Sequence, residues 1–181
     1  RITELDVSEA RQAPGIVAVF TAADIAAAGN LGPAPVALPG MVPDILARPW
    51  LATGVVRFVG EAIAVIIAET AAAAEDASEL VIVDFDPLDV AVDPVFAATD
   101  QVILHPEHGS NIALEVPFGY TEELFDGCEV VVTRDLVNQR VAVAPLEPRG
   151  LAVVWHEGRV IVWSSTQAPH SVKGKIAGVY E

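Results

Sequence analysis

The chain has 181 residues, enough for one large domain or two small ones, and 52% of them are hydrophobic while 19% are charged. This composition is typical of a folded globular protein and excludes a disordered one. Twenty-five acidic residues against ten basic ones give a formal charge of −15, which argues against binding to nucleic acid or to an anionic membrane surface.

The cysteine content and the length of the apolar runs argue against a disulfide-bonded, an iron–sulfur and a membrane-spanning protein. Cys128 is the only cysteine, so the chain alone forms no disulfide and holds no iron–sulfur cluster. With no His, Lys or Arg close to it in sequence, we expect a buried or partly buried, inert thiol. The apolar run at residues 62–68 is far shorter than the roughly 20 residues of a membrane span, and no signal peptide is visible. We expect a cytoplasmic protein, and we interpret the chain as a piece of a longer one.

The first predicted elements lie within the first 30 residues. Residues 7–10 indicate a short helical turn, and the β-branched run at residues 16–20 predicts a strand that is buried on both faces. Thr21 and Asp24 have capping-box spacing, a hydroxyl followed three residues later by a carboxylate, which predicts a helix that Gly29 closes.

Residues 32–49 contain five prolines, too many for a regular element. We predict an irregular loop. It is either a plain surface connection or a loop that contacts a partner or covers a site.

A strand, helix and strand follow. Residues 55–59 and 62–68 predict strands on either side of a glycine, and Thr70 predicts the N-cap of an alanine-rich helix over residues 71–80. Residues 81–85 predict another strand. This order is typical of a βαβ crossover.

Three polar residues are of a type that can be catalytic or bind a metal: Glu61, His105 and His108. Glu61 follows a glycine between apolar strands, and we predict a structural carboxylate, bonded to Arg57, rather than a catalytic one. His105 and His108 lie in a turn-rich segment without a third ligand at suitable spacing. We therefore predict a linker there and no metal site.

The last third of the chain carries the clearest pattern. Residues 129–135 predict a strand, and residues 151–155 and 159–163 predict a hairpin, joined by a short connection with a glycine. Pro169 is typical of the first position of a helix, whose apolar stripe would be Val172, Ile176 and Val179.

Gln167 therefore lies at a predicted strand-to-helix turn. This position points a carboxamide away from the sheet end, beside free backbone N–H groups, and suits a neutral donor aimed at an oxygen or an anion. The alternative is that Gln167 only caps the helix.

Two motifs resemble one known family. APLEPRG at residues 144–150 with STQAPH at residues 165–170, and RFVGEAIAVIIAET at residues 57–70, resemble the large subunits of xanthine dehydrogenase, aldehyde oxidase and carbon monoxide dehydrogenase. The resemblance implies an α+β chain, with an a/b hammerhead truncated at its N-terminus over residues 1–104 and the start of a molybdopterin-binding domain over residues 105–181.

The resemblance also implies a chemistry. Members hydroxylate or oxidise an aldehyde, an N-heterocycle or CO at a molybdenum centre held by molybdopterin or its cytosine dinucleotide form, with oxygen from water. Gln167 matches the glutamine whose amide lies against the apical oxo ligand. Glu147 and Arg149 match a segment near the active site, and their role is either functional or structural. Iron–sulfur and FAD subunits would take the electrons, within an oligomeric complex.

The family's pterin-binding loops and its general base would lie beyond residue 181, so we expect this chain alone to bind no cofactor and to be inactive. The alternative from another class is a non-catalytic binding or assembly module that shares the hammerhead fold and uses residues 32–49 as its contact surface. A serine or cysteine hydrolase is excluded because no nucleophile lies beside a plausible base.

Overall fold

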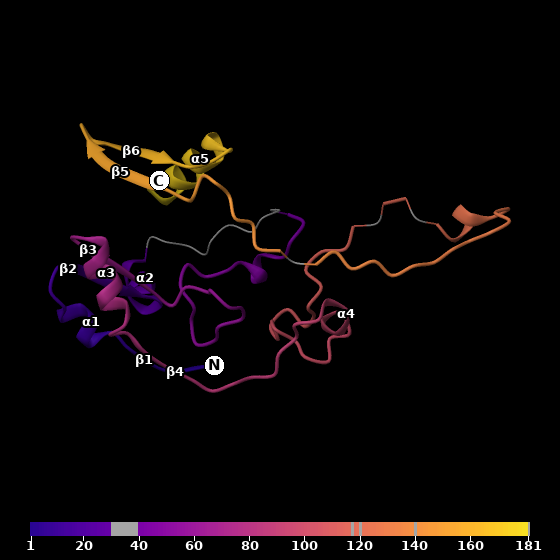
Figure 1. Ribbon diagram of the computed structural model, residues 1–181, viewed down its shortest axis with the longest axis horizontal. Coiled ribbons are helices and arrows are strands. Elements are labelled where there is room, and N and C mark those ends of the chain that lie inside the picture. The colour runs from indigo at the N-terminus through magenta and orange to yellow at the C-terminus, as the bar shows by residue number, and fades with distance from the viewer. Residues whose placement is uncertain (30–39, 117, 120, 140, 181) are drawn as a thin grey trace. The chain divides into compact units, whose positions relative to one another are not determined.

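The structure is a computed structural model, and it describes residues 1–29, 40–116, 118–119, 121–139 and 141–180 (Figure 1). Part of the predicted proline-rich loop, residues 32–39, lies outside these ranges. The chain forms two compact units, an N-terminal unit from Arg1 to Pro117 and a C-terminal unit from Phe118 to Glu181. The predicted α+β class is confirmed, since the chain contains helices together with strands that pair only antiparallel in the described residues.

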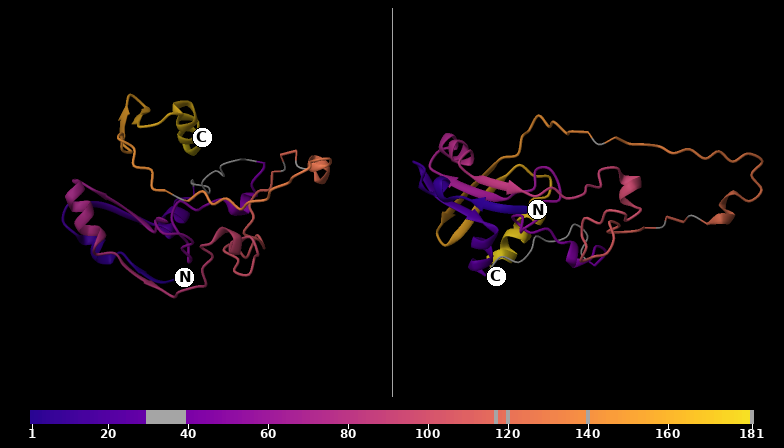
Figure 2. Two further views of the ribbon diagram at one scale, coloured as in Figure 1. Left: turned by 45° about the vertical axis from the view of Figure 1, so that its right-hand side comes forward. Right: turned by 90° about the horizontal axis from the view of Figure 1, so that it is seen from below.

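Antiparallel pairing of distant strands builds the N-terminal unit. Strand β1 (Ile2–Asp6) pairs with β4 (Ile82–Phe85), and β2 (Ile16–Thr21) pairs with β3 (Ala64–Ala68). Helix α3 (Ala71–Ser78) connects β3 to β4, which lie in different sheets (Figure 2). The predicted βαβ crossover is therefore wrong, because each of these two strands takes an antiparallel partner from the beginning of the chain.

A small hydrophobic core lies where α1 (Ser8–Gln12) and α3 pack on the β2–β3 pair. Val7, Ala10 and Val19 are buried there. The prediction that β2 is buried on both faces is wrong: Phe20 is 41% exposed although its neighbour Val19 is buried, since the helices cover one face of this pair. Val17, where the strand register shifts, is 66% exposed. The β-branched run reflects strand preference rather than two covered faces.

Gly15 allows the close approach of α3 to the start of β2. Its φ of +76° lies in the left-handed region that L side chains rarely adopt, and a Cβ there would lie 3.3 Å from that of Ala73. Its carbonyl also accepts a hydrogen bond of 2.8 Å from the N–H of Glu69. Any larger residue at position 15 would have to adopt this unfavourable φ and would also crowd the Cβ of Ala73.

The predicted helix starts are confirmed. At α2 (Ala22–Ala28), Asp24 Oδ2 accepts hydrogen bonds of 2.7 Å from both the N–H and the hydroxyl of Thr21. Gly29 ends this helix with a φ of 70°. At α3, Thr70 Oγ1 accepts a bond of 3.2 Å from the N–H of Ala73. These short helices depend on such caps because they bury little apolar surface.

Two predicted strands are wrong, and both lack a pairing partner. Residues 55–59 run into a turn in which Gly60 has a φ of 92° and the N–H of Glu61 donates to the carbonyl of Phe58. Residues 129–135 are coil, as Figure 2 shows for the orange stretch before β5. Cys128 beside them is exposed, so the expected buried thiol is also wrong.

Short elements join these parts. They are η1 (Asp44–Leu46), α4 (Pro94–Ala97), which Asp93 caps, and η2 (Glu122–Phe125). The C-terminal unit contains β5 (Leu151–His156), β6 (Arg159–Ser164) and α5 (Pro169–Tyr180). None of the helices in the described ranges has the length and apolar character needed to cross a bilayer.

Asn111 holds together the segment that follows α4. Its Nδ2 donates to the carbonyls of Ala97, at 2.9 Å, and Val102, at 2.7 Å. Its Oδ1 accepts from the N–H of Leu104 at 2.8 Å. The side chain thus satisfies three backbone groups of a segment that has no regular hydrogen-bond ladder.

Asp100 accepts bonds from the same region. The N–H of Asn111 and the hydroxyl of Ser110 donate to its two carboxylate oxygens, each at 2.7 Å. These two bonds, the backbone one first, lower the pKa of Asp100. Its φ of 56° is one that Asp and Asn both tolerate.

We predict that Asn111→Ala lowers the free energy of unfolding by about 2 kcal/mol, because three backbone groups lose their partner. Urea denaturation of the 181-residue chain measures it. Asn138→Ala is the matched control, since Asn138 is exposed and bonds to no other described residue. An equal effect of both substitutions would contradict the assigned role of Asn111.

We predict that Asp100→Asn destabilises the chain at pH 7 and that the difference from the unsubstituted chain shrinks in acid. Because the folded pKa lies below the unfolded one, the carboxylate stabilises the fold above about pH 4. This stabilisation is lost as the pH falls through the folded pKa. Urea midpoints of both chains at several pH values test this, and a difference that does not vary with pH would count against it.

Candidate functional site

The hairpin that carries the candidate site has a two-residue turn. Strands β5 and β6 pair from Leu151 opposite Ser164 to His156 opposite Arg159. The turn residues Glu157 and Gly158 both have positive φ, 49° and 75°, which is the conformation of a type I′ turn. The predicted hairpin is confirmed.

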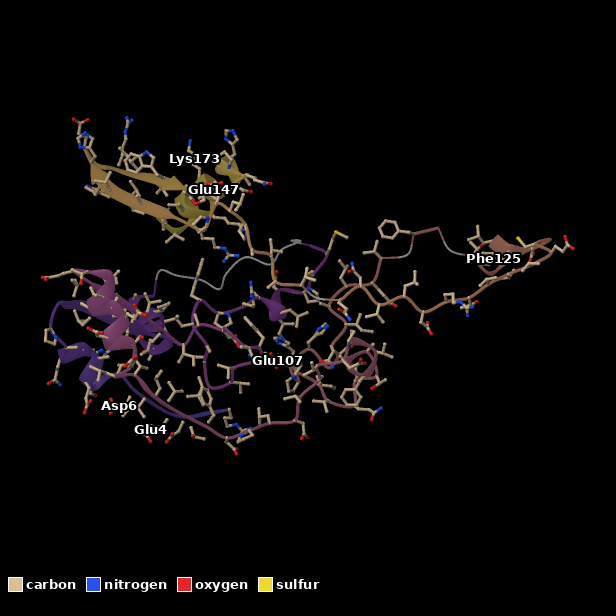
Figure 3. The ribbon with its side chains drawn as sticks, viewed as in Figure 1. Glu4, Asp6, Glu107, Phe125, Glu147 and Lys173 are labelled. Carbon is tan, nitrogen blue, oxygen red and sulfur yellow. The ribbon has the colours of Figure 1, made fainter. Side chains whose placement is uncertain are left out.

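Helix α5 lies across a groove from this hairpin. It begins at Pro169, as predicted, and its stripe residues Val172, Ile176 and Val179 are all half-buried. The groove is lined by β6 residues such as Val160 and Val162, by part of that stripe and by Lys173. Lys173 is labelled in Figure 3.

Ser165 joins the end of β6 to the segment before β5. Its N–H donates to the carbonyl of Gly150 at 3.0 Å, which extends the ladder one residue beyond the strands. Its hydroxyl accepts from the N–H of Gly150 at 2.8 Å and lies 3.1 Å from the carbonyl oxygen of Pro148. One serine thus fixes the backbone of Pro148 and Gly150.

Thr166 shapes the turn that follows. Its Oγ1 accepts a hydrogen bond of 3.0 Å from the N–H of Ala168, one residue before α5. The carbonyl of Ala168 in turn accepts from the N–H of Val172 at 3.1 Å. Neither Ser165 nor Thr166 was predicted as a site residue from the sequence. The signal was the run of hydroxyl residues between a strand and Pro169, since such side chains often bond to nearby backbone.

Gln167 lies in this turn with its side chain exposed. In the part of the chain that the structure describes, its carboxamide has no hydrogen-bond partner, so the bonds of the turn come from its neighbours. The alternative role as a helix cap finds no bond to support it here. Its role toward a cofactor stays a prediction.

Glu147 and Arg149 precede the hairpin, and Glu147 is labelled in Figure 3. Both side chains are exposed, and neither forms an ion pair with any other described residue. The structure therefore leaves both charges available, and only the backbone around Arg149 is bound to Ser165. Whether these residues act on a ligand or support the turn stays a prediction.

A second concave region lies in the N-terminal unit and includes Arg57, Glu61 and Glu107. Arg57 Nε donates to the carbonyl of Leu104 at 3.0 Å, and its Nη2 lies 3.3 Å from Glu107 Oε1. Glu61 Oε2 accepts from the backbone N–H of Arg57 at 2.5 Å. Glu61 is thus bonded to Arg57 as predicted, although to its backbone N–H. The side chains of Glu61 and Arg57 both form contacts within the unit.

The two histidines of the predicted linker also have partners. His105 Nδ1 lies 3.2 Å from Glu107 Oε1, and His108 Nε2 lies 3.2 Å from the carbonyl oxygen of Ile112. Among the described residues, no three His, Cys, Asp or Glu side chains are grouped as metal ligands. The conformation of this segment is explained by these local contacts.

Two domain families match this chain. The a/b hammerhead domain of aldehyde oxidase and xanthine dehydrogenase matches residues 1–89, and the molybdopterin cofactor-binding domain matches residues 104–181. The nicotine 6-hydroxylase large subunit of Paenarthrobacter nicotinovorans is 37% identical over an alignment of 177 positions, which covers 96% of this chain and 21% of that protein. The carbon monoxide dehydrogenase large chain of Afipia carboxidovorans is 32% identical over an alignment of 191 positions, which covers 96% of this chain and 23% of that protein.

A solved structure shares the fold. Quinoline 2-oxidoreductase from Pseudomonas putida 86 matches 98% of this chain and 23% of its own, with a TM-score of 0.82 and 29% identity. The chain thus spans 21% to 23% of the length of these relatives. Both domains are matched in chain order, as RFVGEAIAVIIAET in the first and APLEPRG with STQAPH in the second predict, and the chain belongs to the family of aldehyde oxidase, xanthine dehydrogenase and carbon monoxide dehydrogenase large subunits.

Proposed function

We propose that this chain is part of the large subunit of a molybdenum hydroxylase, which hydroxylates or oxidises a small substrate with oxygen from water. Family membership supports the reaction class. The observation that carries the proposal is Gln167, an exposed carboxamide without a partner among the described residues, held between β6 and α5. A carboxamide that makes no hydrogen bond within the described fold is available to a ligand.

The residues of this turn fit such a cofactor in chemical type. A carboxamide N–H is a neutral donor that neither adds a proton to the site nor is oxidised there. When bound, molybdopterin or its cytosine dinucleotide form supplies the molybdenum that accepts two electrons from the substrate, chemistry that no side chain provides. Gln167 would hold that group by donating its N–H to an acceptor atom, and Arg149 would be available to an anionic part of it.

For the substrate, an N-heterocycle is the first class to test. Two of the similar proteins are named for nicotine and quinoline, and a third is named for carbon monoxide. Aldehydes and carbon monoxide are the other candidates. The chain spans 21% to 23% of the length of these relatives, so in this proposal the choice among them depends on residues outside it.

Partners follow from the electron balance. Two electrons leave the substrate, and Cys128 alone cannot hold an iron–sulfur cluster. Iron–sulfur and FAD centres outside this chain therefore complete the path, and we propose that they belong to separate subunits. A related protein is named as a subunit of the 6-hydroxypseudooxynicotine dehydrogenase complex, which supports a multi-subunit enzyme. Cytoplasmic location stays a prediction.

The assembly-module alternative has one observation in its favour. Met41 and Ile45, at the described end of the proline-rich loop, are 53% and 52% exposed, as expected of a contact surface. An enzyme of the proposed type can use this surface for a partner as well. Redox activity therefore separates the two proposals.

We predict that Gln167→Ala in the full-length protein lowers kcat by about a hundredfold with little change in KM, because one preorganised donor is removed. Dye reduction with nicotine-like heterocycles, aldehydes and carbon monoxide measures activity, and elemental analysis measures bound molybdenum. Gln139→Ala, at an exposed glutamine of the same unit, is the control. Unchanged kcat in Gln167→Ala with full molybdenum content would remove Gln167 from the site.

We predict that the 181-residue chain purified alone carries no more molybdenum than an unrelated control protein and reduces no dye. A single neutral donor with two exposed charges cannot replace the many ligands that a large cofactor requires. Elemental analysis of the chain, purified from cells that make the cofactor, measures this. Stoichiometric molybdenum in the chain would refute the expectation.

A further inference from the structure

We propose that Ser165 is a positioning residue for Gln167, because its hydroxyl holds the start of the strand-to-helix turn in one place. The inference rests on the function proposed above for Gln167. It assigns to Ser165 an effect on the reaction that acts only through the neighbouring carboxamide. Ser165 itself does not touch the cofactor in this proposal.

The first support is the number of bonds that converge on one residue. The hydroxyl accepts from the N–H of Gly150 at 2.8 Å and has the carbonyl oxygens of Pro148 and Gly150 within reach, at 3.1 and 3.3 Å. A hydroxyl has one proton to donate and two lone pairs, so this geometry uses its donor and at least one lone pair. The N–H of Ser165 binds Gly150 as well.

The second support is the position of these bonds along the chain. The regular pairing of β5 and β6 ends at Leu151 and Ser164, and both strands would be free to separate beyond that point. At the next pair, Gly150 and Ser165, the backbone provides one hydrogen bond, from the N–H of Ser165 to the carbonyl of Gly150. The Ser165 hydroxyl adds a second one by accepting from the N–H of Gly150. A Cβ at Gly150 would lie 3.4 Å from this hydroxyl oxygen, so the two residues are in contact.

The third support is what lies on the other side of Gln167. Thr166 Oγ1 binds the N–H of Ala168, and α5 begins one residue later. The backbone of Gln167 is thus constrained before and after, while its carboxamide is left without a described partner. These bonds hold the backbone from which the Gln167 side chain leaves, which is one part of what a preorganised donor requires.

The competing interpretation is that Ser165 only closes the hairpin. It predicts a loss of stability that is independent of Gln167. The positioning role predicts a loss of turnover that exists only while the carboxamide is present. A double-mutant cycle separates the two, since residues that act through one another are not additive.

The experiment uses the full-length enzyme with its cofactor and partner subunits. Ser165→Ala, Ser165→Thr, Gln167→Ala and the double variant Ser165→Ala with Gln167→Ala are compared, with Ser171→Ala on the exposed face of α5 as the control. The measurements are kcat, KM, bound molybdenum, Tm and the electron paramagnetic resonance spectrum of the reduced metal. Ser165→Cys, which keeps the size of the side chain, is prepared in case Ser165→Ala does not fold.

We expect Ser165→Ala to lower kcat about tenfold, since a displaced catalytic group loses rate steeply with distance. KM and molybdenum content stay near those of the parent, Ser165→Thr restores turnover, and the resonance spectrum changes in the direction seen for Gln167→Ala. In the Gln167→Ala background, the loss of Ser165 has no further effect on kcat. Ser165→Cys follows Ser165→Ala, with a smaller loss.

Equal losses of kcat in both backgrounds would overturn the positioning role while the function of Gln167 stands. A lowered Tm with unchanged kcat and spectrum would overturn it in the same way. If Gln167→Ala itself leaves kcat and the spectrum unchanged, the role proposed for Gln167 fails, and the inference fails with it. These results are distinguishable within one set of proteins.

Discussion

Antiparallel pairing between segments far apart in sequence is the interaction on which the N-terminal unit depends. Residues of β1 pair with residues of β4 that lie 76 to 83 positions later, for example Ile2 with Phe85, and residues of β2 pair with residues of β3 that lie 43 to 52 positions later, for example Ile16 with Ala68. The core of Val7, Ala10 and Val19 exists only because these pairs place α1 and α3 on the same face. The core is small, so the backbone ladders and the caps carry much of the organisation.

The sequence predicts local structure well where one residue type determines it. Thr21 with Asp24, Thr70, Gly158 and Pro169 each mark a cap, a turn or a helix start, and the structure has these features where they were expected. The crossover and the strands at residues 55–59 and 129–135 were wrong. Strand formation requires a partner, and nothing within a run of β-branched residues indicates which segment that is.

The same distinction applies to the candidate site. The position of Gln167 between a strand and a helix followed from the hairpin pattern and from Pro169, both local signals. The role of Ser165 could not be read in the same way, because its hydroxyl bonds to Gly150, fifteen residues earlier. The exposure of Cys128 could not be predicted either, because it depends on which residues pack near this side chain. Long-range contacts of this kind become visible only in three dimensions.

The exposed hairpin has a consequence for handling the chain. All six residues of β5 are exposed, including Val153 and Trp155, and in the described part of the chain no third strand lies beside β5 or β6. Both outer edges therefore present unsatisfied N–H and carbonyl groups next to an apolar, proline-free run, the usual template for fibril-like stacking between copies. During synthesis, this stretch is where a chaperone would be most needed until other protein covers it.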